Sequence, residues 1–345
     1  MSTLRECLDL VLRGQDLSRR QVRSALDVIM AGDANALQVA GLLAGLRAKG
    51  ETYDELAGLA ESMRRHAMKL EVPATDRPVV DTCGTGGDGA STINISTAAA
   101  FVAAAGGAMV AKHGNRSISS KCGSADVLEA LGVNLNLDVA GVQRCLSEAS
   151  IGFLFAPHHH PAMKHVMPVR RALGVRTAFN LLGPMTNPAG ARRQVIGVFD
   201  AAYTEVVARA LGALGSAHVL VVCGDDGAGG VLDEISTCGP TVGHELRDGE
   251  VRPISITTDE LGLPMADVRA LKGGDAAQNA AALESVLAGE PGPRGDAVAA
   301  NAGAALYVAG LASTLREGVD AARDLLASGA PATILNALRA ASQGA

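Results

Sequence analysis

A glycine-rich segment, Asp81-Thr-Cys-Gly-Thr-Gly-Gly-Asp-Gly89, stands between a short apolar run and an alanine-rich stretch. Glycine lets the backbone turn tightly, and such a turn ahead of a helix directs free N–H groups at an anion. The spacing of Gly84, Gly86 and Gly89 also satisfies the dinucleotide fingerprint, but no acidic residue follows ~20 positions later to hold a ribose. The segment predicts a phosphate-binding turn; a dinucleotide site and a plain tight turn are the alternatives.

A second polar segment, Lys112-His-Gly-Asn-Arg-Ser-Ile-Ser-Ser120, follows a predicted strand at residues 108–111 and precedes a predicted N-cap at Ser124. We therefore expect a loop at the carboxyl end of a sheet, where open α/β sheets bind their ligands. Its hydroxyl groups, amide and cations suit phosphate oxygens. A merely solvated polar loop is the alternative.

Charged residues are unevenly placed along the chain. The sequence has 36 acidic residues in 345, yet residues 89–125 and 149–199 contain neither Asp nor Glu. The basic residues within these two gaps are Lys112, Arg116 and Lys121 in the first, and Lys164, Arg170, Arg171, Arg176, Arg192 and Arg193 in the second. Two local positive fields in a chain of net charge −6 predict a compact polyanionic ligand rather than a long nucleic acid.

Two further groups invite a metal hypothesis. Asp233 and Glu234 are adjacent carboxylates beyond a predicted strand and a glycine-rich loop, and carboxylates together with a phosphate ligand form a hard-oxygen site for Mg²⁺. Taken alone, such a pair is more often a surface turn. Residues 158–160 are three consecutive histidines, which do not converge on one ion without special geometry, so we expect a polar loop there.

The elements that position these residues follow from hydrophobic periodicity. Apolar residues recur at spacings of three and four from residue 3 to about residue 70, which predicts about four helices ending near Val72. From residue 73 onward, short β-branched runs alternate with helical stretches, which predicts a larger α/β domain with a mainly parallel sheet. We expect domains at 1–72 and 73–345, with residues 158–176 helical and packed against the first.

Composition excludes several classes of protein. Apolar residues make up 48% and charged residues 19%, typical of a globular chain, while 2% aromatic residues leave no stacking platform for single-stranded nucleic acid. The six cysteines are scattered, which argues against a disulfide framework and favours the cytoplasm, as does an N-terminus without a signal sequence. The uncharged stretch 89–111 is rich in Ala and Gly, so it predicts a buried helix and strand rather than a membrane span.

Taken together, these pieces resemble the anthranilate phosphoribosyltransferases of the tryptophan pathway. The resemblance covers nearly the whole chain. It rests on the helical N-terminus and on Gly-Thr-Gly-Gly-Asp at 84–88, Asn-Ile-Ser-Thr at 94–97, Lys-His-Gly-Asn-Arg at 112–116, Cys-Gly-Ser-Ala-Asp at 122–126, Phe-Asn-Leu-Leu-Gly-Pro at 179–184, Asp-Glu at 233–234 and Gly-Gly-Asp-Ala-x-x-Asn at 273–279. The stretch at 227–230 looks longer than is usual for the family.

The resemblance implies transfer of the phosphoribosyl group of phosphoribosyl pyrophosphate (PRPP) to the amine of anthranilate, with Mg²⁺, in a homodimer whose site lies between the two domains. It implies PRPP contacts at Gly84, Gly87, Asp88, Thr92, Asn94, Ile95, Ser96, Thr97, Lys112, His113, Gly114, Asn115, Arg116, Ser117, Ile118, Ser119, Ser120 and Ser124. It implies anthranilate contacts at Gly84, Asn115 and Arg170, and magnesium contacts at Ser96, Asp233 and Glu234.

The chemistry of this reaction asks little of a base. An aryl amine is neutral at pH 7 and needs orientation, whereas the departing diphosphate needs its charge neutralised, so we expect no dedicated catalytic acid or base. Two other functions stay open: a pyrimidine nucleoside phosphorylase, a relative that lacks the His-Gly-Asn-Arg loop, and a non-catalytic family member that binds nucleic acid. The intact loop at 112–116 argues against the first, and the acidic composition argues against the second.

Overall fold

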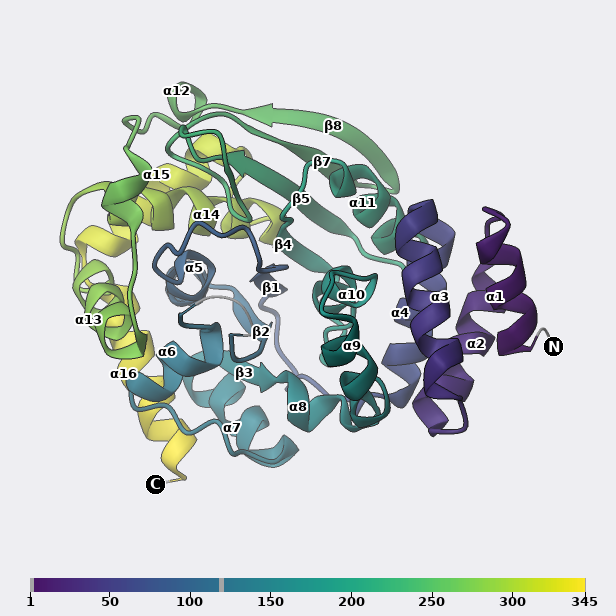
Figure 1. Ribbon diagram of the computed structural model, residues 1–345. Helices are drawn as coiled ribbons and strands as arrows, with labels where there is room; N and C mark the ends of the chain where they lie inside the picture. Colours follow the sequence, from purple (N-terminus) through teal and green to yellow (C-terminus); the bar gives the residue numbers. More distant parts are fainter. Residues whose placement is uncertain (1–2, 118–120, 345) are drawn as a thin grey trace.

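The computed structural model describes residues 3–117 and 121–344 (Figure 1). The chain begins with four helices: α1 (Leu4–Leu12), α2 (Arg19–Ala31), α3 (Ala36–Lys49) and α4 (Tyr53–His66). Local sequence explains their starts, because the side chains of Thr3, Ser18, Asn35 and Thr52 accept hydrogen bonds from the first turn of the helix that each precedes. Helices therefore begin where the sequence supplies a side-chain acceptor.

Within the described residues, eight strands form one sheet of order β3-β2-β1-β4-β5-β7-β8, with β6 paired to β5. The strands are β1 (Val79–Gly84), β2 (Met109–Gly114), β3 (Ile151–Phe155), β4 (Arg193–Gly197), β5 (His218–Asp225), β6 (Val231–Leu232), β7 (Thr241–Arg247) and β8 (Glu250–Ile256). The first five are parallel, which confirms the predicted sheet type. The antiparallel pair β7–β8, which the sequence analysis did not include, extends one edge.

The remaining helices connect the strands and cover the sheet. They are α5 (Ile95–Ala105), α6 (Ser124–Ala130), α7 (Val139–Ala149), α8 (Ala156–His159), α9 (Met167–Leu173), α10 (Phe179–Met185), α11 (Tyr203–Ala213), α12 (Thr258–Leu261), α13 (Ala276–Leu287), α14 (Pro293–Ala309), α15 (Leu315–Ala327) and α16 (Ala330–Gln343). Two short 3-10 helices cover Pro161–His165 and Val268–Leu271. No helix among these described residues is long and apolar enough to cross a membrane.

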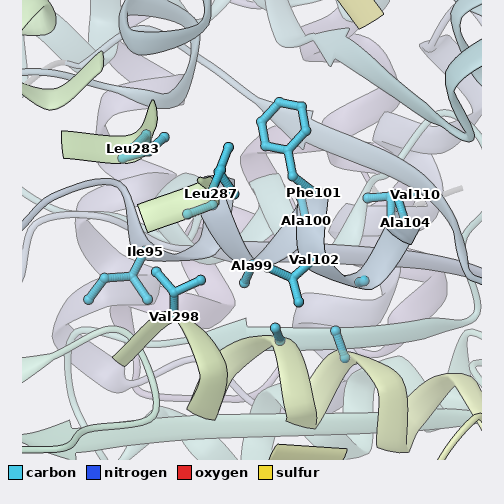
Figure 2. Close-up of a cluster of buried hydrophobic side chains, with 14 of the residues drawn as sticks. Ile95, Ala99, Ala100, Phe101, Val102, Ala104, Val110, Leu283, Leu287 and Val298 are labelled. Carbon is cyan, nitrogen blue, oxygen red and sulfur yellow. The ribbon is translucent and has the colours of Figure 1, made fainter. Parts of the chain in front are cut away.

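One face of the sheet packs against α5, which is buried on nearly all sides. Figure 2 shows Phe101, Val102 and neighbouring alanines of α5 beside Leu283 and Leu287 of α13 and Val298 of α14. Small alanine side chains let α5 approach α14 closely, and this explains why the uncharged stretch at 89–111 is a core element. That stretch forms the predicted buried helix and strand.

The other face carries the helical N-terminal region. Its buried side chains, such as Leu26 and Leu43, form one hydrophobic cluster with Val166 and Val169 of the 161–173 segment and with Ile196 and Val221 of the sheet. In Figure 1, α9 and α10 lie between the sheet and the α1–α4 group. The helical segment at 161–173 therefore fills the space between the N-terminal helices and the sheet.

Two details of the predicted loop at 112–120 were wrong. Strand β2 runs to Gly114, so Lys112 and His113 are strand residues, each held by parallel pairing with β3. Ser124 is the first residue of α6, and Gly123 precedes it as the N-cap, with Asp126 accepting the Gly123 N–H at 2.8 Å. The apolar run at 108–111 did not reveal that pairing with β3 extends the strand into polar residues.

Candidate active site

Asp233 lies at the point where the order of the parallel strands reverses. Strand β1 connects onward to β2 on one side, whereas β4 lies on its other side, and ligands of open α/β sheets bind at such a switch point. Gly84 and Gly197 end these two strands as facing partners. A Cβ on Gly84 would lie 2.2 Å from Asp233 Oδ2, and one on Gly197 would lie 1.5 Å from the Asp233 carbonyl oxygen. The two glycines therefore make room for this acid.

The predicted phosphate-binding turn leads from β1 toward α5. Gly86, Gly87 and Gly89 have φ of 71°, 83° and 78°, a left-handed conformation that favours glycine. The Gly86 N–H donates to Asp233 Oδ2 at 2.6 Å, and Asp88 Oδ1 accepts from the Ala90 N–H at 3.1 Å. The turn and the Asp-Glu pair are thus one connected unit, although 147 residues separate Gly86 from Asp233.

Glu234 faces the first turn of α5. Its Oε1 accepts the Ser96 N–H at 2.9 Å, and Lys112 Nζ lies 3.5 Å from the Ser96 hydroxyl oxygen. Ser96, Asp233 and Glu234, the three residues assigned to magnesium by resemblance, are therefore held in one place by three separate segments. Within the described residues, however, no three His, Cys, Asp or Glu side chains converge as they would at a closed metal centre.

The carboxylates nevertheless fit a divalent cation. Burial raises the pKa of Asp233 well above its usual value, and the nearby charges of Asp88 and Glu234 raise it further. Burial also raises the pKa of Glu234, against the opposing influence of Lys112 and of the Ser96 N–H. A cation would relieve this crowding of negative charge. Mg²⁺ suits such a donor set, because it needs few protein ligands and binds phosphate oxygens and water as well.

Lys112 is directed into the protein. It is only 2% exposed, and Nζ donates to the Thr82 carbonyl oxygen. Burial lowers its pKa, whereas the negative charge of Asp81 acts in the opposite direction. Asp81 is itself fully buried and accepts the His113 N–H at 3.1 Å and an Asn187 Nδ2–H at 2.8 Å. The Lys112 cation therefore lies beneath the site, among groups that order the ends of β1 and β2.

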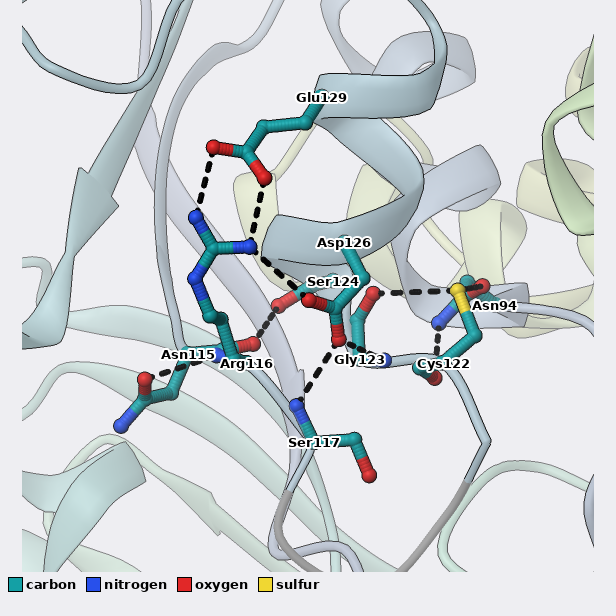
Figure 3. Close-up of polar contacts among 9 residues, drawn as sticks. All are labelled: Asn94, Asn115, Arg116, Ser117, Cys122, Gly123, Ser124, Asp126 and Glu129. Carbon is teal, nitrogen blue, oxygen red and sulfur yellow. Dashed lines mark hydrogen bonds and ion pairs between the residues drawn. The ribbon is translucent and has the colours of Figure 1, made fainter. Parts of the chain in front are cut away.

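A polar cluster at the end of β2, shown in Figure 3, contains residues 115–117, 122–124 and 126. Arg116 donates to Glu129 Oε1 and Oε2 at 2.7 and 2.6 Å and to Asp126 Oδ1 at 3.1 Å. The Ser117 N–H donates to Asp126 Oδ2 at 3.1 Å. The cation of Arg116 is thus engaged with acids of α6 in this structure. The predicted phosphate contacts Ile118, Ser119 and Ser120 lie outside the described residues.

Asn94 connects this cluster to the C-terminal part of the chain. Its Nδ2 donates to the Cys122 carbonyl oxygen at 3.2 Å, and its Oδ1 accepts from Asn279 Nδ2 at 2.9 Å (the Asn94–Cys122 contact is drawn in Figure 3). Thr92 forms a β-bridge with Lys272, whose Nζ donates to the Ala90 carbonyl oxygen. The motif at 273–279 therefore supports the segment between the glycine turn and α5.

Arg170 occupies a half-buried position on α9. Its guanidinium carbon lies 5.4 Å from the ring centre of Phe179, and burial lowers its pKa. Arg171, the next residue, is exposed. Asn115, which the resemblance assigns to anthranilate together with Arg170 and Gly84, stands at the end of β2, while Gly84 ends β1. These three assignments remain predictions.

Arg192 and Arg193, two basic residues of the second acid-free gap, do not belong to the site. Arg192 Nε donates to the Gly215 carbonyl oxygen at 2.7 Å, and Arg193 Nη1 donates to that of Val308 at 2.6 Å. Both stand at the amino end of β4, opposite the edge that carries Asp233, so the prediction of one positive field over residues 149–199 was wrong for them. Backbone carbonyl oxygens, rather than a bound anion, are the hydrogen-bond partners of these two cations.

The three histidines at 158–160 also differ from expectation. His159 and His160 are buried rather than part of a polar loop, and His159 Nδ1 lies 3.0 Å from the Met68 carbonyl oxygen. The ring of His160 lies 5.1 Å from that of His113, and burial lowers the pKa of His160 to about 4 and that of His113 to about 3. A run of three histidines does not reveal that packing of the neighbouring strand and helix buries two of them.

Comparison with known proteins places this chain in a family. Residues 76–332 match the model described as "Glycosyl transferase family, a/b domain", and residues 5–67 match "Glycosyl transferase family, helical bundle domain". The anthranilate phosphoribosyltransferase of Desulfatibacillum aliphaticivorans is 50% identical over 333 residues, 96% of this chain and 97% of that protein. The chain belongs to the anthranilate phosphoribosyltransferase family.

Solved anthranilate phosphoribosyltransferases share the fold. The crystal structure of the Thermus thermophilus protein has a TM-score of 0.89 and 44% identity, covering 98% of this chain and 99% of that one. The protein from Saccharomyces cerevisiae in complex with PRPP and Mg has a TM-score of 0.86 and 26% identity, covering 99% of this chain and 98% of that one. The architecture of a helical domain plus an α/β domain is therefore that of the anthranilate phosphoribosyltransferase family.

Proposed function

We propose that this chain transfers the phosphoribosyl group of PRPP to the amine of anthranilate, giving N-(5-phosphoribosyl)anthranilate and pyrophosphate. The observation that carries the proposal is the placement of Asp233 and Glu234 against the glycine turn, at the switch point of the sheet. A diphosphate together with a divalent cation matches both halves of that arrangement, because the turn offers N–H groups and the acids offer carboxylate oxygens.

The residues of this chain act mainly by binding and orientation. The N–H groups of Thr85 and Gly86 donate to the Gly197 carbonyl oxygen and to Asp233, and the other backbone N–H groups of the turn at 84–89 would hold the diphosphate as it departs. Ser96, Asp233 and Glu234 would hold Mg²⁺, which when bound supplies positive charge to the diphosphate. Lys112 contacts this proposed metal site from the interior of the protein, where its Nζ lies 3.5 Å from the Ser96 hydroxyl oxygen. Charge that develops on the leaving group is thereby met by groups already in position.

The nucleophile needs a different kind of support. Arg170 carries a guanidinium that can hold the carboxylate of anthranilate through charge-assisted hydrogen bonds, and its stacking on Phe179 limits how the guanidinium turns. The amine of anthranilate is already neutral, so correct placement contributes more than proton removal. Asn115, at the end of β2, would orient the amine side of the ring.

Purified protein mixed with anthranilate, PRPP and Mg²⁺ tests the proposal through the loss of anthranilate fluorescence. We expect loss that requires all three components. Persistent fluorescence under these conditions would refute the proposed reaction. A pyrimidine nucleoside phosphorylase would instead require phosphate and a nucleoside, and the family relationship favours the first reaction.

We further propose that the chain works as a cytoplasmic homodimer. All six cysteines are buried thiols, as suits a reducing compartment. On the helical domain, Leu12 of α1 and Leu37 of α3 are 68% and 82% exposed, which supports an apolar contact there. Light scattering should give twice the chain mass, and a monomer would contradict the dimer without affecting the assignment of the reaction.

A further inference from the structure

We propose that Arg176 is a positioning residue that fixes the diphosphate-binding turn from the side of the α9–α10 connection. The inference rests on the proposed function and assigns a role to a residue that is not part of the Asp-Glu pair or of the turn itself. Arg176 lies between α9, which carries Arg170, and α10. It therefore lies between Arg170, the proposed anthranilate contact, and the proposed diphosphate-binding turn.

The contact with the turn is made through the backbone. Arg176 Nη2 donates to the Gly87 carbonyl oxygen, although the two residues are 89 positions apart. A Cβ on Gly87 would lie 3.1 Å from the same nitrogen, so the absence of a side chain allows this approach. Gly87 has a φ of 83°, a conformation that few other residues would adopt.

This contact determines the direction of a neighbouring donor. The C=O of Gly87 and the N–H of Asp88 belong to one planar trans peptide unit, so they point in opposite directions. When Arg176 holds the carbonyl, the Asp88 N–H must point away from the guanidinium. The Asp88 side chain is held by a different contact: its Oδ2 accepts the Asp233 N–H at 3.4 Å. Arg176 thus fixes a peptide group within the predicted anion site.

The guanidinium of Arg176 packs on an aromatic ring. Its central carbon lies 4.2 Å from the ring centre of Phe199, whose ring in turn lies 5.3 Å from that of Tyr203. Arg47 of α3 donates to the Tyr203 hydroxyl, and its guanidinium carbon lies 5.9 Å from the Tyr203 ring centre. A continuous series of contacting groups, in which the Phe199 and Tyr203 rings meet edge-on, therefore runs from the helical N-terminal region to the glycine turn. Arginine suits its end, because a planar cation can stack and donate at once.

The test measures the Michaelis constants for PRPP and anthranilate and the affinity for pyrophosphate with Mg²⁺. We expect Arg176→Ala to raise the constant for PRPP and the dissociation constant for pyrophosphate about tenfold, with kcat and the anthranilate constant changed less. Arg176→Lys should recover only part of this loss, because lysine can donate but stacks poorly. Arg192→Ala is the matched control, since Arg192 also donates to a glycine carbonyl, that of Gly215, but at the opposite edge of the sheet.

A double-mutant cycle separates positioning from general stability. Phe199→Leu removes the stacking surface, and if the ring acts through Arg176, adding this change to Arg176→Ala should raise the PRPP constant no further. A PRPP constant and pyrophosphate affinity within twofold of wild type for Arg176→Ala would overturn the inference, as would fully additive effects in the cycle. Failure of wild type to consume anthranilate would instead refute the proposed reaction, and pyrophosphate binding would still decide the role of Arg176.

Discussion

Asp233 and Glu234 are two half-buried acids whose pKa values are raised, so their charges are poorly solvated without a cation. We expect Asp233→Asn combined with Glu234→Gln to lower kcat/KM by ~100-fold or more, because the charges proposed to hold Mg²⁺ are gone. The fold should survive, since amide oxygens can still accept the N–H groups of Gly86 and Ser96. Magnesium titrations of activity and thermal unfolding measure both effects. Unchanged magnesium dependence would contradict the metal assignment.

Arg170 and Arg171 provide a matched pair of neighbouring arginines. Arg170 is half-buried on Phe179, whereas Arg171 is exposed and lies about 100° further around the helix. Arg170→Ala should raise the Michaelis constant for anthranilate about tenfold to a hundredfold and affect PRPP much less. Arg171→Ala should change either constant less than about threefold. Equal effects of the two changes, or an effect of Arg170 on PRPP alone, would remove Arg170 from the site.

Single residues show where sequence-based prediction succeeded and where it stopped. The glycine turn and the Asp-Glu pair were each recognised locally, but the 2.6 Å contact between Gly86 and Asp233 depends on strand order, which no local pattern supplies. Arg176 was noted only as one basic residue in a gap. Its partner Gly87 is 89 positions away, so sequence alone gave no indication of the pairing.

At the scale of elements, the last residues of β1 and β4 must both lack a side chain for Asp233 to fit. Gly84→Ala would place a Cβ 2.2 Å from Asp233 Oδ2, so the acid must shift. We expect kcat/KM to fall about tenfold to a hundredfold while the unfolding temperature changes little. Gly183→Ala in α10 is the control, because a Cβ there meets no atom within 4 Å. Equal activity of the two variants would show that the close approach is not required.

His113 of β2 contacts His160, which follows α8, and this buried pair predicts that the folded protein loses stability at acidic pH. Burial lowers the pKa of His113 to about 3 and that of His160 to about 4, both from an ordinary value of 6.5. Folded protein therefore binds fewer protons than unfolded protein below pH 6.5, and stability falls as the pH decreases toward those values. From about pH 7 to pH 5, each histidine should reduce the free energy of unfolding by up to ~2 kcal/mol.

His160→Gln should remove one of these two contributions. Urea unfolding at both pH values measures it, and the comparison is between the pH-dependent losses rather than the absolute stabilities, since the substitution itself changes packing. The variant should lose about 2 kcal/mol less than wild type on acidification. An identical loss in both proteins would mean that His160 is not a buried neutral group.

Elements were predicted best where they carry a strong local pattern. Apolar residues at spacings of three and four correctly predicted four N-terminal helices. The pair β7–β8 was not predicted, because its strands are half-exposed and lack a long apolar run. The extension of β2 through Lys112 and His113 was missed for a related reason: pairing with β3 and burial of polar groups are tertiary effects.

At the scale of the whole molecule, the structure joins distant segments around one edge of a sheet. The N-terminal helices and the 161–173 segment share one hydrophobic cluster with the sheet, so Arg170 is carried on an element that also contacts α3. The glycine turn, α5 and Asp233 belong to the sheet side. An acceptor held on one side and a diphosphate on the other is the arrangement that group transfer requires.

The most direct test of this account is the stoichiometry of the reaction. Purified wild-type protein, supplied with anthranilate, PRPP and Mg²⁺, should release one pyrophosphate for each anthranilate consumed, with neither change when any component is omitted. Fluorescence reports the anthranilate, and a coupled assay reports the pyrophosphate. Pyrophosphate released at the same rate without anthranilate, or anthranilate left unconsumed while PRPP and Mg²⁺ are present, would contradict the central claim.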